Sequence, residues 1–193
     1  RRGKGGVPAG DDLSVVVEQI VDCWGSAPIF IDAAMVRGVP YLGTNSRAVE
    51  HFFEALAFAG VQAIPVTRPG QAPSFQSSIR EAARMAGHGI ALRVPLVNLR
   101  TPSRGRELHE LVAHLGMEPG RLDVIVEYGL VSEEAPSFSY ICHRLPDLRG
   151  WRTFTALAGS FPPDLMGLRV GEHEVQREEW KRWAAEITSP SGL

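Results

Sequence analysis

The sequence predicts an α/β protein in which short parallel strands alternate with helices. Apolar runs begin near residues 28, 61, 89, 122 and 153, so that a strand recurs about every 30 residues with a helical pattern between. This repeat is typical of parallel strands joined by right-handed helical crossovers. The runs are apolar throughout, which indicates strands buried on both faces. An α/β barrel and a doubly wound sheet both satisfy these observations.

The expected strands cover residues 28–31, 61–66, 89–96, 122–126 and 153–158. No strand is followed by G-x-G-x-x-G, which disfavours a dinucleotide-binding sheet. A closed eight-stranded barrel takes about 250 residues. Five strands therefore predict either an open arc that something else completes or a flavodoxin-like sheet.

Helices are expected where apolar residues recur at helical spacing: residues 11–24, 44–59, 74–86, 103–115, 138–145 and 178–187. Asp11 and Asp12, Thr44 or Asn45, and Ser103 are suited to cap the first, second and fourth of these helices, and Ser74 is expected to start the third. Trp180 and Trp183 share one face of the last helix, which favours packing on the sheet over an exposed partner site. The residues expected to face inward include Leu13, Val16, Val17, Ile20, Trp24, Val49, Phe52, Phe53, Leu56, Ala59, Phe75, Ile79, Ala82, Ala83, Met85, Leu108, Leu111, Val112, Leu115, Phe138, Ile141, Cys142 and Leu145.

The composition is that of an ordinary globular protein. The chain has 193 residues, a formal net charge of −2 and 22% charged residues. The net charge disfavours nucleic acid as a partner, and no apolar run is long enough to span a membrane. The two cysteines, Cys23 and Cys142, are expected to be buried free thiols in a reducing cytoplasm. Residues 1–10 are expected to form a flexible tail before a single α/β domain at residues 11–193.

Polar side chains stand where the predicted strands end, and the carboxyl ends of parallel strands meet at one edge of a sheet. Two carboxylates and two guanidinium groups there fit an anionic ligand. The carboxylates fit equally a divalent cation, or general acid and base chemistry. The structural alternative is that these carboxylates and guanidinium groups form ion pairs with one another. A charge at Arg93, within an apolar strand, needs a partner in either case. The candidate ligand-binding residues are Asp32, Thr67, Arg68, Arg93, Glu127 and Ser160.

Two other motifs give weaker evidence of function. His173 lies in Glu-His-Glu, but position 177 is Arg where a zinc signature needs a second His. Ser160 lies in Gly-Ser-Phe-Pro, which is not the G-x-S-x-G turn of hydrolases. We therefore expect no metal and no cofactor.

Four segments carry a family resemblance: PIFIDAA (28–34), VQAIPVT (61–67), TFTALAGSFP (153–162) and DLMGLRVGEHEVQREEW (164–180). In order and spacing they resemble the Beta protein family of phage and bacterial proteins, and LPDLRGWRTFTALAGSFP is the most specific stretch. The resemblance implies a TIM-barrel-like fold about twice this length, of which the chain covers the middle as a partial arc of about five parallel strands. It also implies a phage-related setting, such as antiviral defence, and it carries no settled reaction.

Two functions stay open from the sequence. One is binding, in which a protein partner or a further chain segment completes the barrel, or an anionic ligand is held at the carboxyl ends of the strands. The alternative is a barrel enzyme whose strand-exit carboxylates hydrolyse a phosphate ester or similar bond. We also expect Arg93 and Glu127 to face the barrel interior or its mouth, close enough to interact, since an Arg side chain easily spans the gap between adjacent strands.

Overall fold

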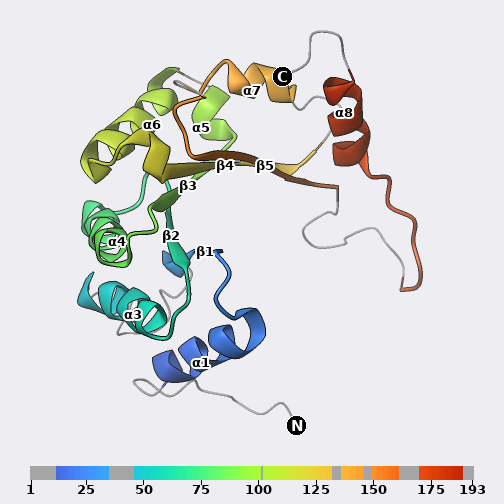
Figure 1. The fold of residues 1–193 in the computed structure, drawn as a ribbon. Coiled ribbons are helices and arrows are strands. Elements are labelled where there is room, and N and C mark those ends of the chain that lie inside the picture. Colours follow the sequence, from blue (N-terminus) through green and yellow to red (C-terminus); the bar gives the residue numbers. More distant parts are fainter. Residues whose placement is uncertain are drawn as a thin grey trace.

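The computed structural model describes residues 12–34, 46–100, 102–131, 136–145, 149–160 and 170–188. A single parallel sheet runs through it in the order of the sequence, β1-β2-β3-β4-β5. The sheet curls into a half-barrel that is open on its concave side (Figure 1). The predicted arc of five parallel strands is therefore confirmed. The strands are β1 (Ile29–Ile31), β2 (Ala63–Thr67), β3 (Ile90–Pro95), β4 (Leu122–Leu130) and β5 (Thr153–Gly159).

Helices line the outer side of the curved sheet (Figure 1). Contacts run from α1 to α3, on to α4 and then to α6, and α8 contacts both α7 and β5. One short helix, α5, was not predicted, because four residues are too few to show a helical period. The helices are α1 (Asp12–Trp24), α3 (Ser46–Phe58), α4 (Pro73–Ala86), α5 (Val97–Arg100), α6 (Pro102–Leu115), the 3-10 turn η2 (Pro119–Arg121), α7 (Phe138–Cys142) and α8 (Glu178–Ile187).

The main core lies between the helices and the convex face of the sheet. Alternate strand residues such as Leu92, Val124 and Val126 pack there against buried helix residues such as Phe53 and Leu56. The other strand residues point to the concave face, where a small separate cluster forms. That cluster consists of Ile64, Val66 and Ala91, with Ile125 packed against it. The register aligns these inward residues across neighbouring strands, with Val66 beside Ala91 and Arg93 beside Ile125.

The concave face is less covered than the sequence predicted. Along β5, exposed residues alternate with half-buried ones, so the expectation of strands buried on both faces is wrong for this strand. Phe154 and Ala156 pack on the helix side, whereas Leu157, which pairs with Glu127, is 50% exposed. Phe30 on β1 pairs with Ile64 and is 43% exposed. Both ends of the sheet therefore present apolar side chains on the inner face.

Several expected core positions lie at the surface. Val16, Trp24 and Met85 are exposed, because only half of each helix circumference faces the sheet. Trp180 and Ile187 are also exposed, so the predicted packing of α8 on the sheet is wrong for them. Trp183, at the boundary of exposure, forms an edge-to-face contact with Phe138 on α7. Ala59 is exposed in the turn after α3.

Two of the predicted helix starts, the start at Ser74 and the cap at Ser103, are also corrected. α4 begins at Pro73 with Ala72 as its N-cap, and α6 begins at Pro102. Ser74 and Ser103 therefore lie inside the first turn of their helices. Proline is favoured at the first helical position because its missing N–H would have no partner there, and this preference outweighed the serine. The caps proposed at Asp11, Thr44 and Asn45 and the tail at residues 1–10 lie outside the described residues.

Candidate functional site at the carboxyl ends of the strands

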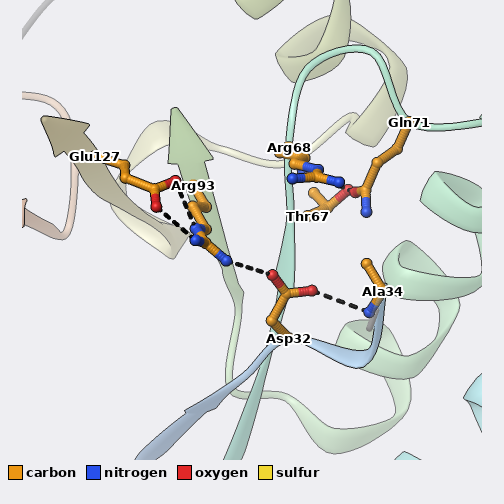
Figure 2. Close-up of polar contacts among 7 residues, drawn as sticks. All are labelled: Asp32, Ala34, Thr67, Arg68, Gln71, Arg93 and Glu127. Atoms are coloured by element: carbon orange, nitrogen blue, oxygen red, sulfur yellow. Dashed lines mark hydrogen bonds and ion pairs between the residues drawn. The ribbon is translucent and has the colours of Figure 1, made fainter. Parts of the chain in front are cut away.

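Three charged side chains meet at the carboxyl end of the sheet (Figure 2). The guanidinium of Arg93 on β3 forms two parallel hydrogen bonds to Glu127 on β4, Nη2 to Oε1 at 2.6 Å and Nε to Oε2 at 2.9 Å. Its Nη1 donates to Oδ2 of Asp32 at 3.0 Å. Asp32 directly follows β1, so Arg93 reaches over β2 to link the first and fourth strands. The predicted proximity of Arg93 and Glu127 is confirmed.

The strand register explains why this trio forms. Arg93 pairs with Ile125, and Glu127 is the next residue along β4 on the same face. Asp32 is held by its own backbone, since the amide N–H of Ala34 donates to Oδ1 at 3.0 Å. The arginine fork therefore meets two carboxylates whose positions are set by the sheet and by a turn.

The trio is partly shielded from water. The side chains of Arg93, Asp32 and Glu127 are 30%, 21% and 29% exposed. Its hydrogen bonds to Glu127 raise the pKa of the Arg93 guanidinium above its usual value; Asp32 adds in the same direction, and partial burial opposes both. One guanidinium faces two carboxylates, which gives the trio a formal charge of −1. This balance suits a structural ion pair or a cationic or neutral polar group better than an anion.

Two more predicted residues lie at the carboxyl end of β2: Thr67 is its last residue, and Arg68 begins the loop that follows. Thr67 is buried, and its hydroxyl donates to Oε1 of Gln71 at 2.7 Å. The Arg68 backbone N–H donates to the same Gln71 oxygen at 2.9 Å. The Arg68 side chain is half-buried and forms no ion pair with any residue in the described ranges. The structure thus gives Thr67 a structural partner and leaves the Arg68 charge without an ion-pair partner among the residues that it describes.

The sixth candidate, Ser160, does not join the trio. Its hydroxyl donates to the carboxylate of Glu179 and accepts a 3.3 Å hydrogen bond from the Glu179 backbone N–H. The hydrogen bond from Ser160, and then that from Arg177, lowers the pKa of Glu179 below its usual value. Ser160 therefore satisfies an amide in the first turn of α8 and anchors that helix to the end of β5.

A second ion pair, which the sequence-based search for candidates missed, lies near the opposite end of the strands. The side chain of Asp123 on β4 is only 2% exposed. Arg152 donates to both of its carboxylate oxygens, from Nε to Oδ1 at 2.9 Å and from Nη2 to Oδ2. The hydroxyl of Thr153 donates to Oδ1 at 2.7 Å. An aspartate inside an apolar run was the available signal, because a charge buried there requires partners.

Gly89 shows how tightly this second cluster is built. Its φ is +82°, and a Cβ at this position would lie 2.2 Å from the carbonyl oxygen of Arg121 and 2.8 Å from Nη1 of Arg152. Only glycine tolerates both the backbone conformation and the close approach. The same Nη1 donates to the carbonyl of His88 at 2.5 Å, so Arg152 ties the start of β3 to the start of β4.

Both cysteines are free thiols, but the expected burial is wrong for Cys23, which is exposed on α1. Cys142 is half-buried on α7, where burial raises the pKa of its thiol and the Glu186 carboxylate adds to the effect. We expect iodoacetamide at pH 8 to modify Cys23 at least about tenfold faster than Cys142, because access and thiolate content set the rate. Peptide mapping by mass spectrometry over time measures both sites, and equal rates would contradict the expectation.

Two absences hold for the described ranges. There, His, Cys, Asp and Glu side chains do not gather in groups of three or more that could hold a metal ion. None of the described helices is long and apolar enough to cross a membrane.

Fold and site together define an α/β half-barrel protein with an internally paired charge trio at the carboxyl ends of its strands. A model of the Beta protein family matches residues 4–192, nearly the whole chain. The chain belongs to the Beta protein family, so the resemblance inferred from the sequence is confirmed. A search of curated proteins found no match.

Proposed function

We propose that this Beta-family chain acts by binding a polypeptide partner on the concave face of its half-barrel. The observation that carries the proposal is the combination of a self-paired charge trio with exposed apolar side chains on the same face. Asp32 and Glu127 are both engaged by Arg93. Phe30 and Leu157, near the two ends of the sheet, are exposed. A general base or a metal ligand would first have to break its ion pair, whereas a polypeptide can cover the face as it stands.

The edges of the sheet support the same proposal. Within the described residues, β1 pairs only with β2, and β5 pairs only with β4. Each edge offers backbone donors and acceptors to an added strand, and strand addition to an open edge is a common mode of peptide recognition. Phe30 and Leu157, which are exposed on this face, would then gain apolar cover from the partner. The partner is a separate polypeptide or a further segment of the barrel, and we propose the phage–host setting of the family as its context.

The alternative, a hydrolytic barrel enzyme, has less support from the geometry. Hydrolysis of a phosphate ester needs a site that attracts a phosphate, and the trio carries more negative than positive charge. Arg93 has both of its hydrogen-bonding edges committed to carboxylates. Binding is therefore the function that the arrangement supports best.

The test places a photoreactive benzophenone amino acid at Leu157 and, as a control, at Met85. Met85 is a matched position, since it is 47% exposed but lies on α4 on the convex side. We expect ultraviolet cross-linking in cells to attach a discrete polypeptide at position 157 and none at position 85. Equal labelling at both positions, or none at either, would contradict the proposal.

A second measurement then uses the purified cross-linked polypeptide, or the segment of it that carries the adduct. Because burying a leucine side chain contributes about 1.5–3 kcal/mol, Leu157→Glu should weaken its binding at least about tenfold. Met85→Glu should leave the affinity unchanged. An adduct that is a second copy of this chain would identify the partner as the chain itself, and equal affinities for the two variants would count against the concave face.

A further inference from the structure

The turn between β2 and α4 contains a fixed and buried side-chain amide. Gln71 is only 7% exposed. Its Oε1 accepts hydrogen bonds from the Thr67 hydroxyl at 2.7 Å and from the Arg68 backbone N–H at 2.9 Å. A backbone N–H can only donate, so the atom that it contacts must be the amide oxygen. The orientation of the amide is therefore determined, and its other end is an NH2 group with two hydrogens to donate.

No protein acceptor meets that NH2 group. Nε2 of Gln71 is the one buried side-chain polar atom without a hydrogen-bond partner among the residues that the structure describes. Leaving such a donor unpaired inside a protein costs about 1–3 kcal/mol. In Figure 2 this nitrogen lies on the side of the loop that faces Asp32 and Ala34. An oxygen acceptor from outside the described residues would remove the cost.

The surroundings of the amide favour an acceptor that is negatively charged. The Arg68 guanidinium belongs to the same turn and forms no ion pair with the described residues. The turn leads directly into α4, a 14-residue helix whose N-cap, Ala72, supplies no side-chain hydrogen bond. The partial positive charge of a helix N-terminus stabilises an anion nearby. The Asp32 carboxylate, which Nε2 of Gln71 faces in Figure 2, forms an ion pair with Arg93.

We propose that the turn formed by residues 67–72 binds a small oxyanion, a carboxylate or a phosphate, through Nε2 of Gln71 and the guanidinium of Arg68. This site is separate from the partner surface on the concave face and does not depend on it. The sequence predicted that Arg68 and Arg93 would both contribute to an anion site, whereas the proposed site uses Arg68 without Arg93. Arg93 is occupied by two carboxylates, whereas Arg68 and Gln71 both have donors to give.

The experiment titrates the purified protein with sodium phosphate and, separately, with sodium acetate at constant ionic strength. The readouts are the melting temperature and the NMR signal of the Gln71 side-chain NH2. We expect at least one anion to raise the melting temperature and shift that signal. If only phosphate changes the two readouts, the natural ligand is a tetrahedral oxyanion. If only acetate changes them, the natural ligand is a carboxylate. If neither anion shifts the Gln71 signal, a solvent molecule satisfies the amide and the proposal is wrong.

Two variants and a control locate the effect. Gln71→Glu keeps an oxygen for Thr67 and for the Arg68 N–H but replaces the NH2 donors with a second oxygen, so anion binding should weaken at least about tenfold. Arg68→Gln should weaken binding to a similar extent. Arg84→Gln removes a basic side chain that forms an ion pair with Glu81 on the exposed side of α4, and its response should equal that of the wild type. An unchanged response in Gln71→Glu, or equal losses in Arg68→Gln and Arg84→Gln, would overturn the proposal.

Discussion

Arg152→Met should lower the free energy of unfolding by about 3–5 kcal/mol, because it leaves the Asp123 carboxylate buried with a single hydrogen-bond donor. Asp123 is 2% exposed, and Arg152 supplies two of the three donors that its side chain meets among the described residues. Methionine keeps most of the apolar stem of arginine, so lost packing contributes little. Urea unfolding followed by tryptophan fluorescence measures the change.

A control and a rescue separate charge from bulk. Arg121→Met removes another basic side chain near the same end of the sheet, whose exposed head group donates to the carbonyl of Gly87, and it should cost less than about 1 kcal/mol. Arg152→Met combined with Asp123→Asn should recover part of the loss, because the buried charge is gone. If the single and double variants unfold at the same urea concentration, the unpaired carboxylate is not the cause.

The pH dependence of this contribution follows from the arginine. The hydrogen bonds to Asp123 raise the pKa of the Arg152 guanidinium above its usual value. A group whose pKa is raised by folding stabilises the folded state fully below its unfolded pKa and loses that contribution as pH rises through the folded value. The arginine therefore stays charged in both states at neutral pH. We expect the difference between wild type and Arg152→Met to be constant from pH 6 to pH 9.

The arc of parallel strands could be predicted because it rests on local patterns. An apolar run that recurs every 30 residues leaves few alternatives to strand–helix crossovers. The exposed inner face could not be predicted in the same way. Leu157 and Phe30 lie in apolar runs that the sequence predicts to be buried. Whether their side chains are buried depends on how many strands the barrel has, and the local pattern does not give that number. The same limit explains Trp180 and Trp183, which any helical wheel assigns to the packed face of α8.

The part of the charge trio that could be predicted from the sequence is the part that the strand register determines. Arg93 and Glu127 occupy inward positions near the ends of adjacent strands, and a charge in an apolar strand calls for a partner. Asp32 joins them because arginine is long enough to reach across β2. Ser160 does not join the trio because it is hydrogen-bonded to Glu179 on α8. Glu179 lies 19 residues further along the chain, so the pattern of the strand alone could not predict the contact. Gln71 was overlooked because an amide in a turn has no pattern; its significance comes from two hydrogen bonds that fix its oxygen.

Arg93→Ala is expected to lower the free energy of unfolding by about 2–4 kcal/mol, slightly less than Arg152→Met. The change leaves Asp32 and Glu127 without their shared cation, but both carboxylates are partly exposed and can be hydrated in part. If Arg93 served instead to hold a ligand, the folded chain alone would lose little stability on its removal. Thermal and urea unfolding of the purified protein distinguish these two roles.

The double variant Arg93→Ala/Glu127→Gln completes the argument. Glu127 accepts two of the three hydrogen bonds that Arg93 makes to carboxylates, so neutralising it should recover at least about 1 kcal/mol of the loss. Arg93→Ala/Asp32→Asn should recover less, since Asp32 accepts one bond from Arg93 and retains that from Ala34. This order of rescue follows from the geometry of the fork. No recovery in either double variant would remove the ion-pair explanation and return Arg93 to the list of ligand-binding residues.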